Sequence, residues 1–388
     1  MQQLRIGKRL VFTLLLLAIS VLLSEFGLQL FYRLSNGQWL WQWWEIPIYE
    51  TDEYRVFRVK RNLKFRHATE EYKARYYTNQ QGFRTDKQQR ALRFEKGDNT
   101  YRIMYLGPSF TFGWGVDYEQ SYEYLINKQL HIDHMKIESI NVGTPAQPMN
   151  YQLSWLRKIG FRYLPNLIVQ TVYSDCCMNM AEDGALPQNP PYVRNGYLYA
   201  PRPKNKLEYI RHIINRYRRY SALIFYGWLL YSKIAMEDGR MGSGEELYKS
   251  RGRKEVCGEN TILKKYRNYR KYVWKSVGWE IPIVFIYIPL AYVVRPADIM
   301  RVKHHGDYKN PIFERSYTQR VEEFLNKNGI IFIDLTKALV SGDRKNRMYN
   351  FYDIHFTIKG NQVAAEKAAP IIEEVIERKS PRRWKNTR

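Results

Sequence analysis

Apolar and polar positions follow different patterns in different parts of this chain of 388 residues. Residues 10–32 form one apolar run, whereas residues 33–98 are aromatic and basic and show little periodicity. From residue 99 to residue 379, short apolar runs alternate with stretches of helical spacing. The sequence therefore predicts a basic N-terminus at 1–9, a hydrophobic segment, an aromatic and basic segment, a folded domain and a basic tail at 380–388.

The apolar run has the length of a membrane span. About 22 helical residues reach about 33 Å, which is enough to cross the core of a bilayer. Glu25 is the only charged residue of the run before Arg33. Arg5, Lys8 and Arg9 precede the run, and Trp39, Trp41, Trp43 and Trp44 follow it. A basic flank keeps the N-terminus in the cytoplasm, and tryptophans are typical of a membrane interface, so we expect residues 33–98 to be juxtamembrane.

Three interpretations of this run compete: a retained signal anchor, a cleaved signal peptide and the buried helix of a soluble protein. The small residues Ala18 and Ser20 have the spacing of a cleavage site, but they lie inside the apolar run and not after it. We therefore expect a single-pass signal anchor at 10–32. It would place the following domain outside the cytoplasmic membrane, in the periplasm or at the cell surface.

The domain from residue 99 onward has the pattern of an α/β protein. Short β-branched or aromatic runs occur at Tyr101–Leu106, Ile137–Val142, Leu167–Val172, Ile283–Ile288 and Ile330–Asp334. Helical spacing occurs at Asp117–His131, Asn150–Phe161, Ile262–Val277, Ser316–Lys327 and Gln362–Arg378. Strands that alternate with helices predict parallel βαβ units with right-handed crossovers. Pro370 is expected to kink or shorten the last helix.

Residues 180–258 interrupt this alternation after the third predicted strand. The segment begins with a stretch rich in Pro, Gly and Asn, and it continues with an apolar segment at Ser221–Ile234 and a charged loop. Ligands of α/β sheets bind beyond the carboxyl ends of the strands. We therefore expect an insertion that shapes a substrate cleft.

The chain is strongly basic, with 62 Lys and Arg against 38 Asp and Glu and a formal net charge of +24. Such a charge favours anionic partners. The basic residues are scattered, however, and the sequence has no zinc-finger spacing, aromatic RNA-binding signature or basic zipper. We therefore expect a charged, solvated surface, with contact to an anionic polymer or lipid surface as the alternative, and no nucleic acid.

The three cysteines limit which disulfide bonds and metal sites the sequence can form. Cys176 and Cys177 are adjacent, and Cys257 stands alone. Outside the cytoplasm Cys257 can bridge to one of the pair, but we favour plain core packing of the two adjacent residues. Three thiols without spaced histidines predict no metal site.

A candidate nucleophile lies in the stretch "LGPSFTFGWGV", residues 106–116. Ser109 follows the first predicted strand and precedes a helical stretch, and a tight strand-to-helix turn can hold a hydroxyl clear of the backbone for chemistry. In "FYDIHFTIKG", His355 supplies a base, and Asp353 supplies a carboxylate that orients it. The backbone N–H groups of Ser109 and Gly143 can form an oxyanion hole.

These segments resemble, in order and spacing, the four sequence blocks of the SGNH (GDSL-type) serine hydrolases. The similarity is to the membrane-anchored, extracytoplasmic bacterial members of that family. "LGPSFTFGWGV" is similar to the first block, "NVGTP" to the second, "TVYSD" to the third and "FYDIHFTIKGNQVAAE" to the last. The resemblance extends over residues 76–378.

The resemblance implies a three-layer α/β/α fold with a five-stranded parallel sheet, and no metal or organic cofactor. It makes Ser109 the nucleophile, His355 the general base and acid, and Asp353 its orienter. It also implies an oxyanion hole that is formed by Ser109, Gly143 and Ser174.

Two positions depart from the family pattern. Pro108 stands where the first block has an aspartate, and its fixed φ and missing N–H can reset the turn. Ser174 stands where the third block has an asparagine that donates to the oxyanion. A serine hydroxyl can donate but reaches less far, and the loss of one oxyanion donor typically costs about 10² to 10³ in rate.

Three functions therefore compete. We favour an anchored serine esterase or deacetylase that acts on acylated glycans or other esters through an acyl-Ser109 intermediate. The first alternative is an O-acyltransferase of cell-surface polysaccharide, which would use the same Ser109 and His355. The second is a catalytically impaired glycan-binding or scaffold protein, and the intact segment around Asp353 and His355 argues against it.

Overall fold

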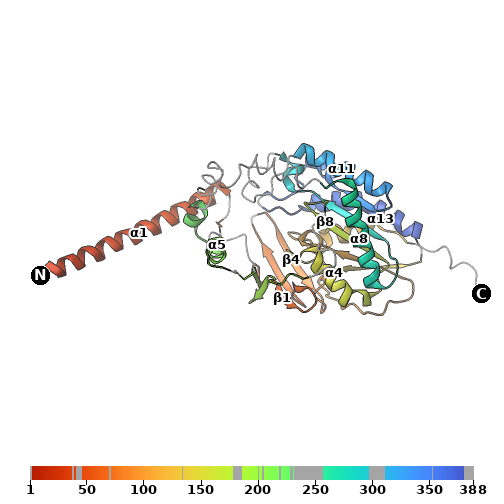
Figure 1. Ribbon diagram of the computed structural model, residues 1–388, viewed down its shortest axis with the longest axis horizontal. Coiled ribbons are helices and arrows are strands. Elements are labelled where there is room, and N and C mark those ends of the chain that lie inside the picture. Colours follow the sequence, from red (N-terminus) through yellow and green to blue (C-terminus); the bar gives the residue numbers. More distant parts are fainter. Residues whose placement is uncertain are drawn as a thin grey trace, which may run out of the picture. The chain divides into compact units, whose positions relative to one another are not determined.

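A computed structural model describes most of the chain. The described residues are 2–36, 39–40, 46–69, 71–132, 134–177, 186–199, 201–202, 205–217, 220–227, 230, 257–296, 311–351 and 353–379. They divide into two compact units, Met1–Glu45 with Arg202–Glu246 and Ile46–Pro201 with Leu247–Arg388. The second unit contains the central sheet and its helices (Figure 1).

An eight-stranded sheet forms the centre of the second unit, in the order β12-β11-β8-β6-β7-β5-β4-β3. The strands that the apolar runs predict are its parallel strands, namely β6 (Thr100–Leu106), β7 (Lys136–Asn141), β8 (Leu167–Tyr173), β11 (Ile283–Ile288) and β12 (Ile331–Asp334). Because β6 pairs with both β7 and β8, the chain extends the sheet to one side and then reverses to the other. Ligand sites of open α/β sheets form at such a reversal.

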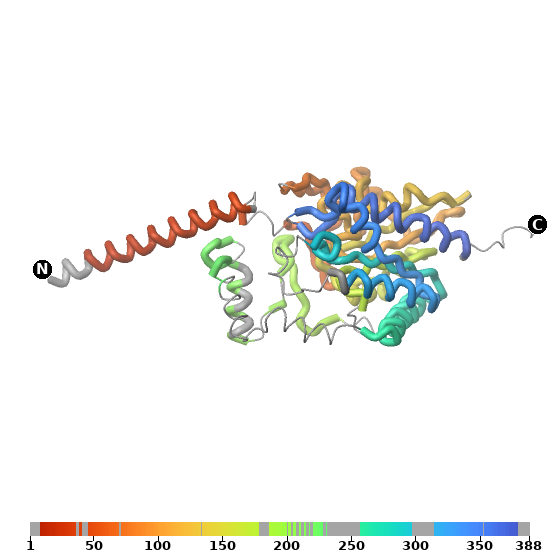
Figure 2. The backbone as a smooth tube through the Cα atoms, turned by 90° about the horizontal axis from the view of Figure 1, so that it is seen from above, coloured from red at the N-terminus to blue at the C-terminus, as the bar shows by residue number. Residues whose placement is uncertain are grey.

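Helices cover both faces of the parallel strands, as Figures 1 and 2 show. One face packs against α4 (Met149–Lys158), α8 (Glu259–Val277) and α11 (Pro311–Lys327). The other face packs against α3 (Tyr122–Gln129), α12 (Thr336–Asp343) and α13 (Ile358–Lys379). Shorter helical turns are α9 (Ala291–Val294), η2 (Tyr118–Gln120) and η3 (Gly160–Tyr163). The predicted three-layer α/β/α fold is confirmed, although the sheet has eight strands and not five.

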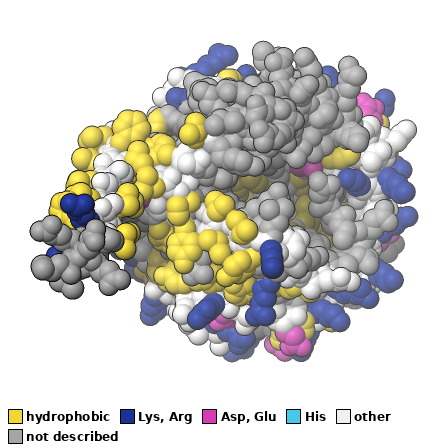
Figure 3. Space-filling model, turned by 60° about the vertical axis from the view of Figure 1, so that its left-hand side comes forward, with side chains coloured by type: hydrophobic (Ala, Val, Ile, Leu, Met, Phe, Trp, Pro, Cys, Tyr) yellow, Lys and Arg dark blue, Asp and Glu magenta, His cyan; other side chains and the backbone are white. Residues whose placement is uncertain are grey.

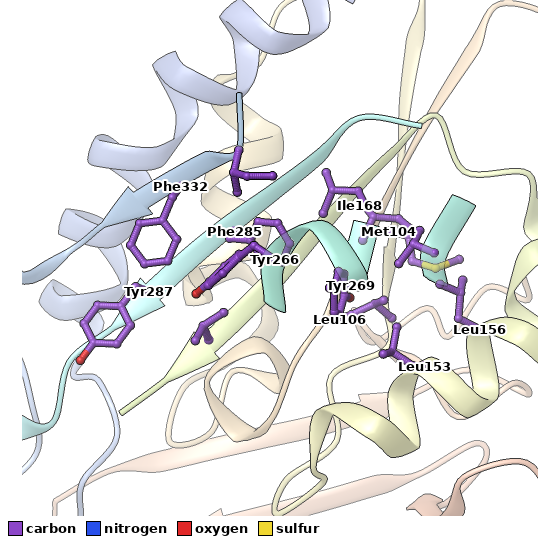
Figure 4. Close-up of a cluster of buried hydrophobic side chains, with 14 of the residues drawn as sticks. Met104, Leu106, Leu153, Leu156, Ile168, Tyr266, Tyr269, Phe285, Tyr287 and Phe332 are labelled. Carbon is purple, nitrogen blue, oxygen red and sulfur yellow. The ribbon is translucent and has the colours of Figure 1, made fainter. Parts of the chain in front are cut away.

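Alternate residues of each parallel strand enter opposite cores, as the twofold period of a strand requires. Met104 and Leu106 of β6 pack in the cluster with α4 and α8, whereas Ile103 and Tyr105 pack in the cluster with α3 and α13. Figure 4 shows the first of these clusters, in which aromatic side chains of α8 lie on β11. Because both of their faces are covered, β8 and β11 are mostly apolar in the sequence, whereas β7, with the sequence KIESIN, is partly exposed and more polar.

The other three strands of the sheet come from the segment before the predicted domain. β3 (Lys64–Ala68), β4 (Lys73–Thr78) and β5 (Arg84–Thr85) are antiparallel, and β5 joins the edge of β7. β1 (Tyr49–Asp52) and β2 (Val56–Val59) form a separate hairpin ahead of them. Residues 33–98, for which the sequence predicted no strand, thus contribute an extension of the sheet. The buried positions of β4 include small and polar residues, which hide its alternation.

The first unit is built around α1 (Gln2–Asn36). Within its stretch Lys8–Ser35, a window of 18 residues has a mean hydropathy of 2.3 and no buried residue, so the stretch is long and apolar enough to cross a membrane. α5 (Lys206–Tyr217) belongs to the same unit. Three tryptophans of the expected aromatic belt and the C-terminal tail lie outside the described residues: Trp41, Trp43, Trp44 and 380–388.

The predicted insertion at 180–258 is shared between the two units. Its strands β9 (Tyr192–Arg194) and β10 (Tyr197–Tyr199) form a hairpin in the second unit, whereas α5 belongs to the first. A disulfide joins Cys177 to Cys257 across 80 residues and closes the insertion at its base, and Cys176 is a buried thiol outside the bridge. The structure therefore contains the bridge, and not the plain core packing of both adjacent cysteines that the sequence favoured.

The last helix also differs from its prediction. α13 is neither shortened nor interrupted at Pro370 and continues to Lys379. Pro370 and Glu366, whose carbonyl oxygen loses its helical partner, both lie on the exposed side, where water can replace the missing bond. Residues on the opposite side of α13, such as Ala368 and Ile372, are buried in the core. Packing of that side therefore keeps the helix continuous.

Candidate active site

Ser109 lies at the point where the sheet reverses. It is the first residue of α2 (Ser109–Phe112), a single helical turn that follows β6 directly. The connection is tight, because a Cβ atom on Gly107 would meet Thr111 Oγ1 at 1.9 Å and Thr171 Cβ at 2.8 Å. Only glycine fits there. Ser109 thus has the strand-to-helix setting that the sequence predicts for it.

Three buried hydroxyl groups fix this turn to the neighbouring strand. Thr111 Oγ1 donates to Thr171 Oγ1 of β8 at 2.7 Å. The hydroxyl of Tyr122 lies 2.9 Å from the first oxygen and 2.6 Å from the second. Because a buried hydroxyl without a partner is costly, this closed set of bonds favours a single position of α2 and of Ser109.

His355 meets Ser109 at the carboxyl edge of the sheet. Its Nε2 lies 2.6 Å from Ser109 Oγ, which is within the reach that proton transfer from a serine requires. Its Nδ1 is hydrogen-bonded to Asp353 Oδ1, and its backbone N–H donates to the same oxygen at 3.0 Å. The structure therefore brings the three candidate residues into one hydrogen-bonded chain.

Two side chains that the sequence did not single out hold the other oxygen of Asp353. The Tyr72 hydroxyl donates to Asp353 Oδ2 at 2.7 Å, and Trp114 Nε1 donates to it at 3.0 Å. Burial opposes the charged form, but the nearby His355 and the hydrogen bonds from His355 and Tyr72 outweigh it and lower the pKa of Asp353 below its ordinary value. Asp353 is therefore a carboxylate at neutral pH.

The groups behind Asp353 are neutral. Burial and the charge of Asp353 raise the pKa of Tyr72 above its ordinary value, so the phenol stays a donor. Burial lowers the pKa of His67 to about 4, and its Nδ1 lies 3.0 Å from the Tyr76 hydroxyl. The His67 ring packs edge-on against Tyr72 and Trp114, with 5.1 Å between centroids in each case. This packing fixes the two donors that hold Asp353.

Glu71 fixes the loop that carries the base. It lies in the turn between β3 and β4, and its carboxylate accepts the backbone N–H of Asp353 at 2.9 Å and that of Phe351. Within the loop, the N–H of Asn350 donates to the carbonyl oxygen of His355 at 2.9 Å. The antiparallel strands therefore hold this loop, although they carry neither the nucleophile nor the base.

The first departure from the family pattern leaves the nucleophile turn in place. Pro108 precedes α2 with a φ of −81°, and its carbonyl oxygen accepts the N–H of Phe112 at 3.1 Å. The first N–H groups of a helix have no partner inside the helix. The missing N–H of Pro108 therefore does not break the turn.

The backbone N–H groups of the other two oxyanion candidates are hydrogen-bonded within the protein. The N–H of Gly143 donates to Asn141 Oδ1 at 2.9 Å. A Cβ atom on Gly143 would lie 2.4 Å from the Phe112 nitrogen, so the loop after β7 packs directly on α2. Ser174 has a φ of 63° and donates its N–H to the carbonyl oxygen of Ile288 at 3.0 Å. Their oxyanion roles stay predictions, and for Gly143 the role requires the bond to Asn141 to open.

Sequence reasoning missed Tyr72, Glu71 and Trp114. Trp114 lies inside the segment that carries Ser109, so its nearness to the site is visible in the sequence, but its partner is not. Tyr72 lies 281 residues before Asp353, in a segment without a clear period. Tertiary pairing of the antiparallel strands brings it to the site, and no local pattern signals that pairing.

The fold and the site define an α/β/α protein with serine, histidine and aspartate in one hydrogen-bonded chain at the carboxyl edge of its parallel strands. No family model matches the sequence, and no curated protein matches it. Among solved structures, the chain is similar to a member of the lipolytic protein G-D-S-L family from Veillonella parvula, with 10% identity and a TM-score of 0.35 over 70% of this chain and 97% of that chain.

Two further solved structures are similar to a comparable extent. One is the inhibitor-bound aryl esterase of M. smegmatis, with 13% identity and a TM-score of 0.37 over 71% of this chain and 99% of that chain. The other is a lipase/acylhydrolase from Enterococcus faecalis, with 12% identity and a TM-score of 0.35 over 71% of this chain and 96% of that chain. Such identities and TM-scores carry no argument about activity, which we infer from the site itself.

Proposed function

We propose that this chain is a serine ester hydrolase of the SGNH type, anchored in the cytoplasmic membrane with its catalytic domain outside. One observation carries the proposal: His355 Nε2 lies 2.6 Å from Ser109 Oγ, and Nδ1 of the same ring is bonded to Asp353. A serine nucleophile needs a base within hydrogen-bond reach and a carboxylate that orients this base. A catalytically impaired binding protein would need neither.

The reaction has two halves. His355 Nε2 takes the proton of Ser109 as Oγ attacks the ester carbonyl carbon, and it returns this proton to the alcohol when the ester C–O bond breaks. Water then gives a proton to His355 and attacks the acyl-Ser109 carbonyl. The carboxylic acid leaves, and Ser109 regains its proton. Asp353 stabilises the imidazolium that forms in each half.

We infer an ester substrate near the outer face of the membrane, such as an acylated glycan. An anchor keeps the domain close to that surface, and the net charge of +24 favours an anionic substrate. An O-acyltransferase would use the same three residues and would pass the acyl group to a sugar hydroxyl. Product analysis with and without acceptor sugar separates the two, because hydrolysis releases free acid in either case.

Two features outside the site support the location. α1 is long and apolar enough to span a bilayer, and basic residues precede its apolar stretch in the sequence. The bridge between Cys177 and Cys257 is of a kind that persists in oxidising compartments.

The proposal is tested by labelling the full-length protein in detergent with a fluorophosphonate probe. The wild type should label, and Ser109→Ala and His355→Ala should not. Their rates on an aryl acetate should fall about 10⁴-fold or more. Ser276→Ala, which changes a serine on α8, should label like the wild type. A folded wild-type protein that does not react with the fluorophosphonate would contradict the hydrolase proposal and favour the glycan-binding alternative.

A further inference from the structure

Glu25 is the one acidic residue between Lys8 and Ser35, the stretch of α1 that is long enough to span a membrane. At 1.5 Å per residue it lies about 22 Å along the helix from Leu10, and the hydrocarbon core is about 30 Å thick. Glu25 is therefore expected inside the outer half of the bilayer. A carboxyl group at that depth requires polar partners.

A second segment of the chain supplies these partners. Residues 222–227 are helical, and the carboxyl group of Glu25 takes the free N–H groups at their N-terminal end. Oε1 accepts from the nitrogen of Ala222 at 2.7 Å, and Oε2 accepts from the nitrogen of Leu223 at 3.1 Å. The hydroxyl of Ser221 donates to Oε2 at 2.8 Å. Glu25 thus caps this segment from another helix, which satisfies both the carboxyl group and the exposed backbone donors.

Further contacts align the segment with the outer part of α1. Gln29 Nε2 donates to the carbonyl oxygen of Tyr220 at 2.8 Å and to Glu25 Oε1 at 2.8 Å. The Tyr32 ring meets Phe225 edge-on, with 5.6 Å between centroids. Ala222 is fully buried in the same cluster. Glu25 contacts residues 221–223, whereas the rings of Phe31 and Tyr32 contact Tyr226 and Phe225. From Ser221 onward the segment therefore runs along α1 toward its C-terminal end.

α5 leads directly into this segment and has an apolar face. Tyr209, Ile210, Ile214 and Tyr217 lie within an arc of about 140°, at 100° per residue. All four side chains are exposed, as are Tyr220, Ile224 and Leu230 beyond them. Figure 3 shows one face of the molecule on which hydrophobic side chains gather. Exposed apolar residues in such number mark a contact surface.

The sequence around α5 indicates which partner covers this face. Residues 202–219 contain one acidic residue, Glu208, and seven basic residues: Arg202, Lys204, Lys206, Arg211, Arg216, Arg218 and Arg219. Basic amphipathic helices of this kind bind anionic lipid headgroups and bury their apolar face at the acyl boundary. Residues 220–227 pack on α1 near Glu25. At that depth in the bilayer, their sides that α1 does not cover would contact lipid acyl chains.

We propose that α5 and residues 220–227 form a membrane-embedded hairpin, held against the outer half of α1 by Glu25, with lipid on its apolar face. The catalytic domain is then tied to the membrane by three helical segments and not by α1 alone. The inference rests on the proposed anchor, since without a span at α1 Glu25 has no bilayer around it.

The test uses the full-length protein in lipid nanodiscs, with a fluorophore on Ile224→Cys and quenching by doxyl-labelled lipid. Leu16→Cys in the middle of α1 reports on the anchor, and Met135→Cys, on an exposed loop of the catalytic domain, is the matched control. Cys177 and Cys257 are bridged, and Cys176 is buried, so the new thiol can be labelled selectively. Quenching at position 224 should match position 16, whereas position 135 should stay unquenched.

Variants of Glu25 then test what holds the hairpin. Glu25→Leu should bring quenching at position 224 down to the level of position 135, and Glu25→Gln should keep part of it, since its amide oxygen can still accept an N–H. Quenching at position 16 without quenching at position 224 would overturn the hairpin and leave the anchor intact. Disulfide-linked dimers through Ile224→Cys, with no lipid quenching, would also overturn it. Fluorophosphonate labelling of Ser109 in the same discs reports separately on the proposed function.

Discussion

The two parts of the central sheet contribute to the candidate site in different ways. The parallel strands place Ser109 at the end of β6, and the helix layer behind them carries His355 to it. The antiparallel strands contribute neither residue, yet their β3–β4 turn brings Tyr72 and Glu71 to Asp353. One part of the sheet therefore supplies the nucleophile, while the other holds the carboxylate and the loop of the base.

Arg84 joins the two parts. It lies fully buried in β5, and its guanidinium donates to the carbonyl oxygens of Phe112 at 3.2 Å, Val116 at 3.2 Å and Arg75 at 3.0 Å. Burial lowers the pKa of Arg84 to about 10, which leaves it charged at neutral pH. A buried cation with several carbonyl partners binds them firmly. The segment that carries Trp114 is thereby tied to the antiparallel strands.

The largest effect after loss of Ser109 or His355 is expected where the two parts meet, at Asp353. Asp353→Asn keeps the size of the side chain but presents a neutral group to His355 Nδ1, which favours the wrong tautomer of the imidazole. We expect kcat on an aryl acetate to fall about 10⁴-fold, with little change in KM. A loss smaller than about tenfold would mean that Asp353 does not orient the base.

A smaller effect is expected when only the antiparallel contribution is removed. Tyr72→Phe deletes one hydrogen bond to Asp353 and leaves the one from Trp114. A hydrogen bond to a charged group is worth about 1.5 to 3 kcal/mol, so we expect kcat to fall between about 10-fold and 100-fold while KM is unchanged. Tyr77→Phe, on the neighbouring strand β4, is the matched control.

Tyr72→Phe and Tyr77→Phe are most informative when they are measured together. If Tyr72→Phe reduced kcat no more than Tyr77→Phe, the antiparallel strands would serve stability and not the site. If it raised KM instead of lowering kcat, Tyr72 would contact substrate and would not be a positioning residue for Asp353. A thermal unfolding curve for each variant shows whether a loss of activity is a loss of folded protein.

The parallel part of the sheet could be predicted from the sequence because most of its strands are buried on both faces. The run Ile283–Ile288 coincides with β11, and the other four runs agree with their strands to within one or two residues. Ser109 could be placed because it follows a predicted strand, and His355 because it precedes the last predicted helix. Ligands bind at the edge of the sheet where the carboxyl ends of parallel strands meet.

The antiparallel part could not be predicted in the same way. β5 consists of Arg84 and Thr85 alone, and it meets β7 at one residue, Asn141. Two residues carry no measurable period, and contacts such as that of Tyr72 with Asp353 depend on pairing that only the folded chain shows. The bond between Gly143 and Asn141 is local, but the spacing of residues does not distinguish it from an oxyanion contact.

The smallest effect on activity is expected at Glu123, which contacts Asn141 where the antiparallel strand β5 meets the parallel strand β7. Glu123 is a fully buried residue of α3, and its carboxyl group accepts from Asn141 Nδ2 at 3.2 Å, from Asn127 Nδ2 at 3.0 Å and from the hydroxyl of Ser139. Burial raises the pKa of Glu123 to about 7, although these hydrogen bonds and the charge of Arg84 oppose the shift. It has no contact with Ser109 or His355 among the described residues, so kcat should change little.

Glu123→Gln should instead change how stability depends on pH. Because its pKa is higher in the folded protein than in the unfolded chain, the folded protein holds this proton more tightly. The free energy of unfolding therefore falls as pH rises from about 4.5 to about 7. Glutamine does not titrate. The free energy of unfolding of Glu123→Gln should therefore rise relative to that of the wild type by on the order of 1 kcal/mol between pH 5 and pH 8. This figure follows from about 1.4 kcal/mol per pKa unit, reduced because the hydrogen bonds rearrange. Thermal unfolding at both pH values measures this difference. Parallel pH dependences would mean that the pKa of Glu123 is the same in the folded protein and in the unfolded chain, and would contradict the raised pKa.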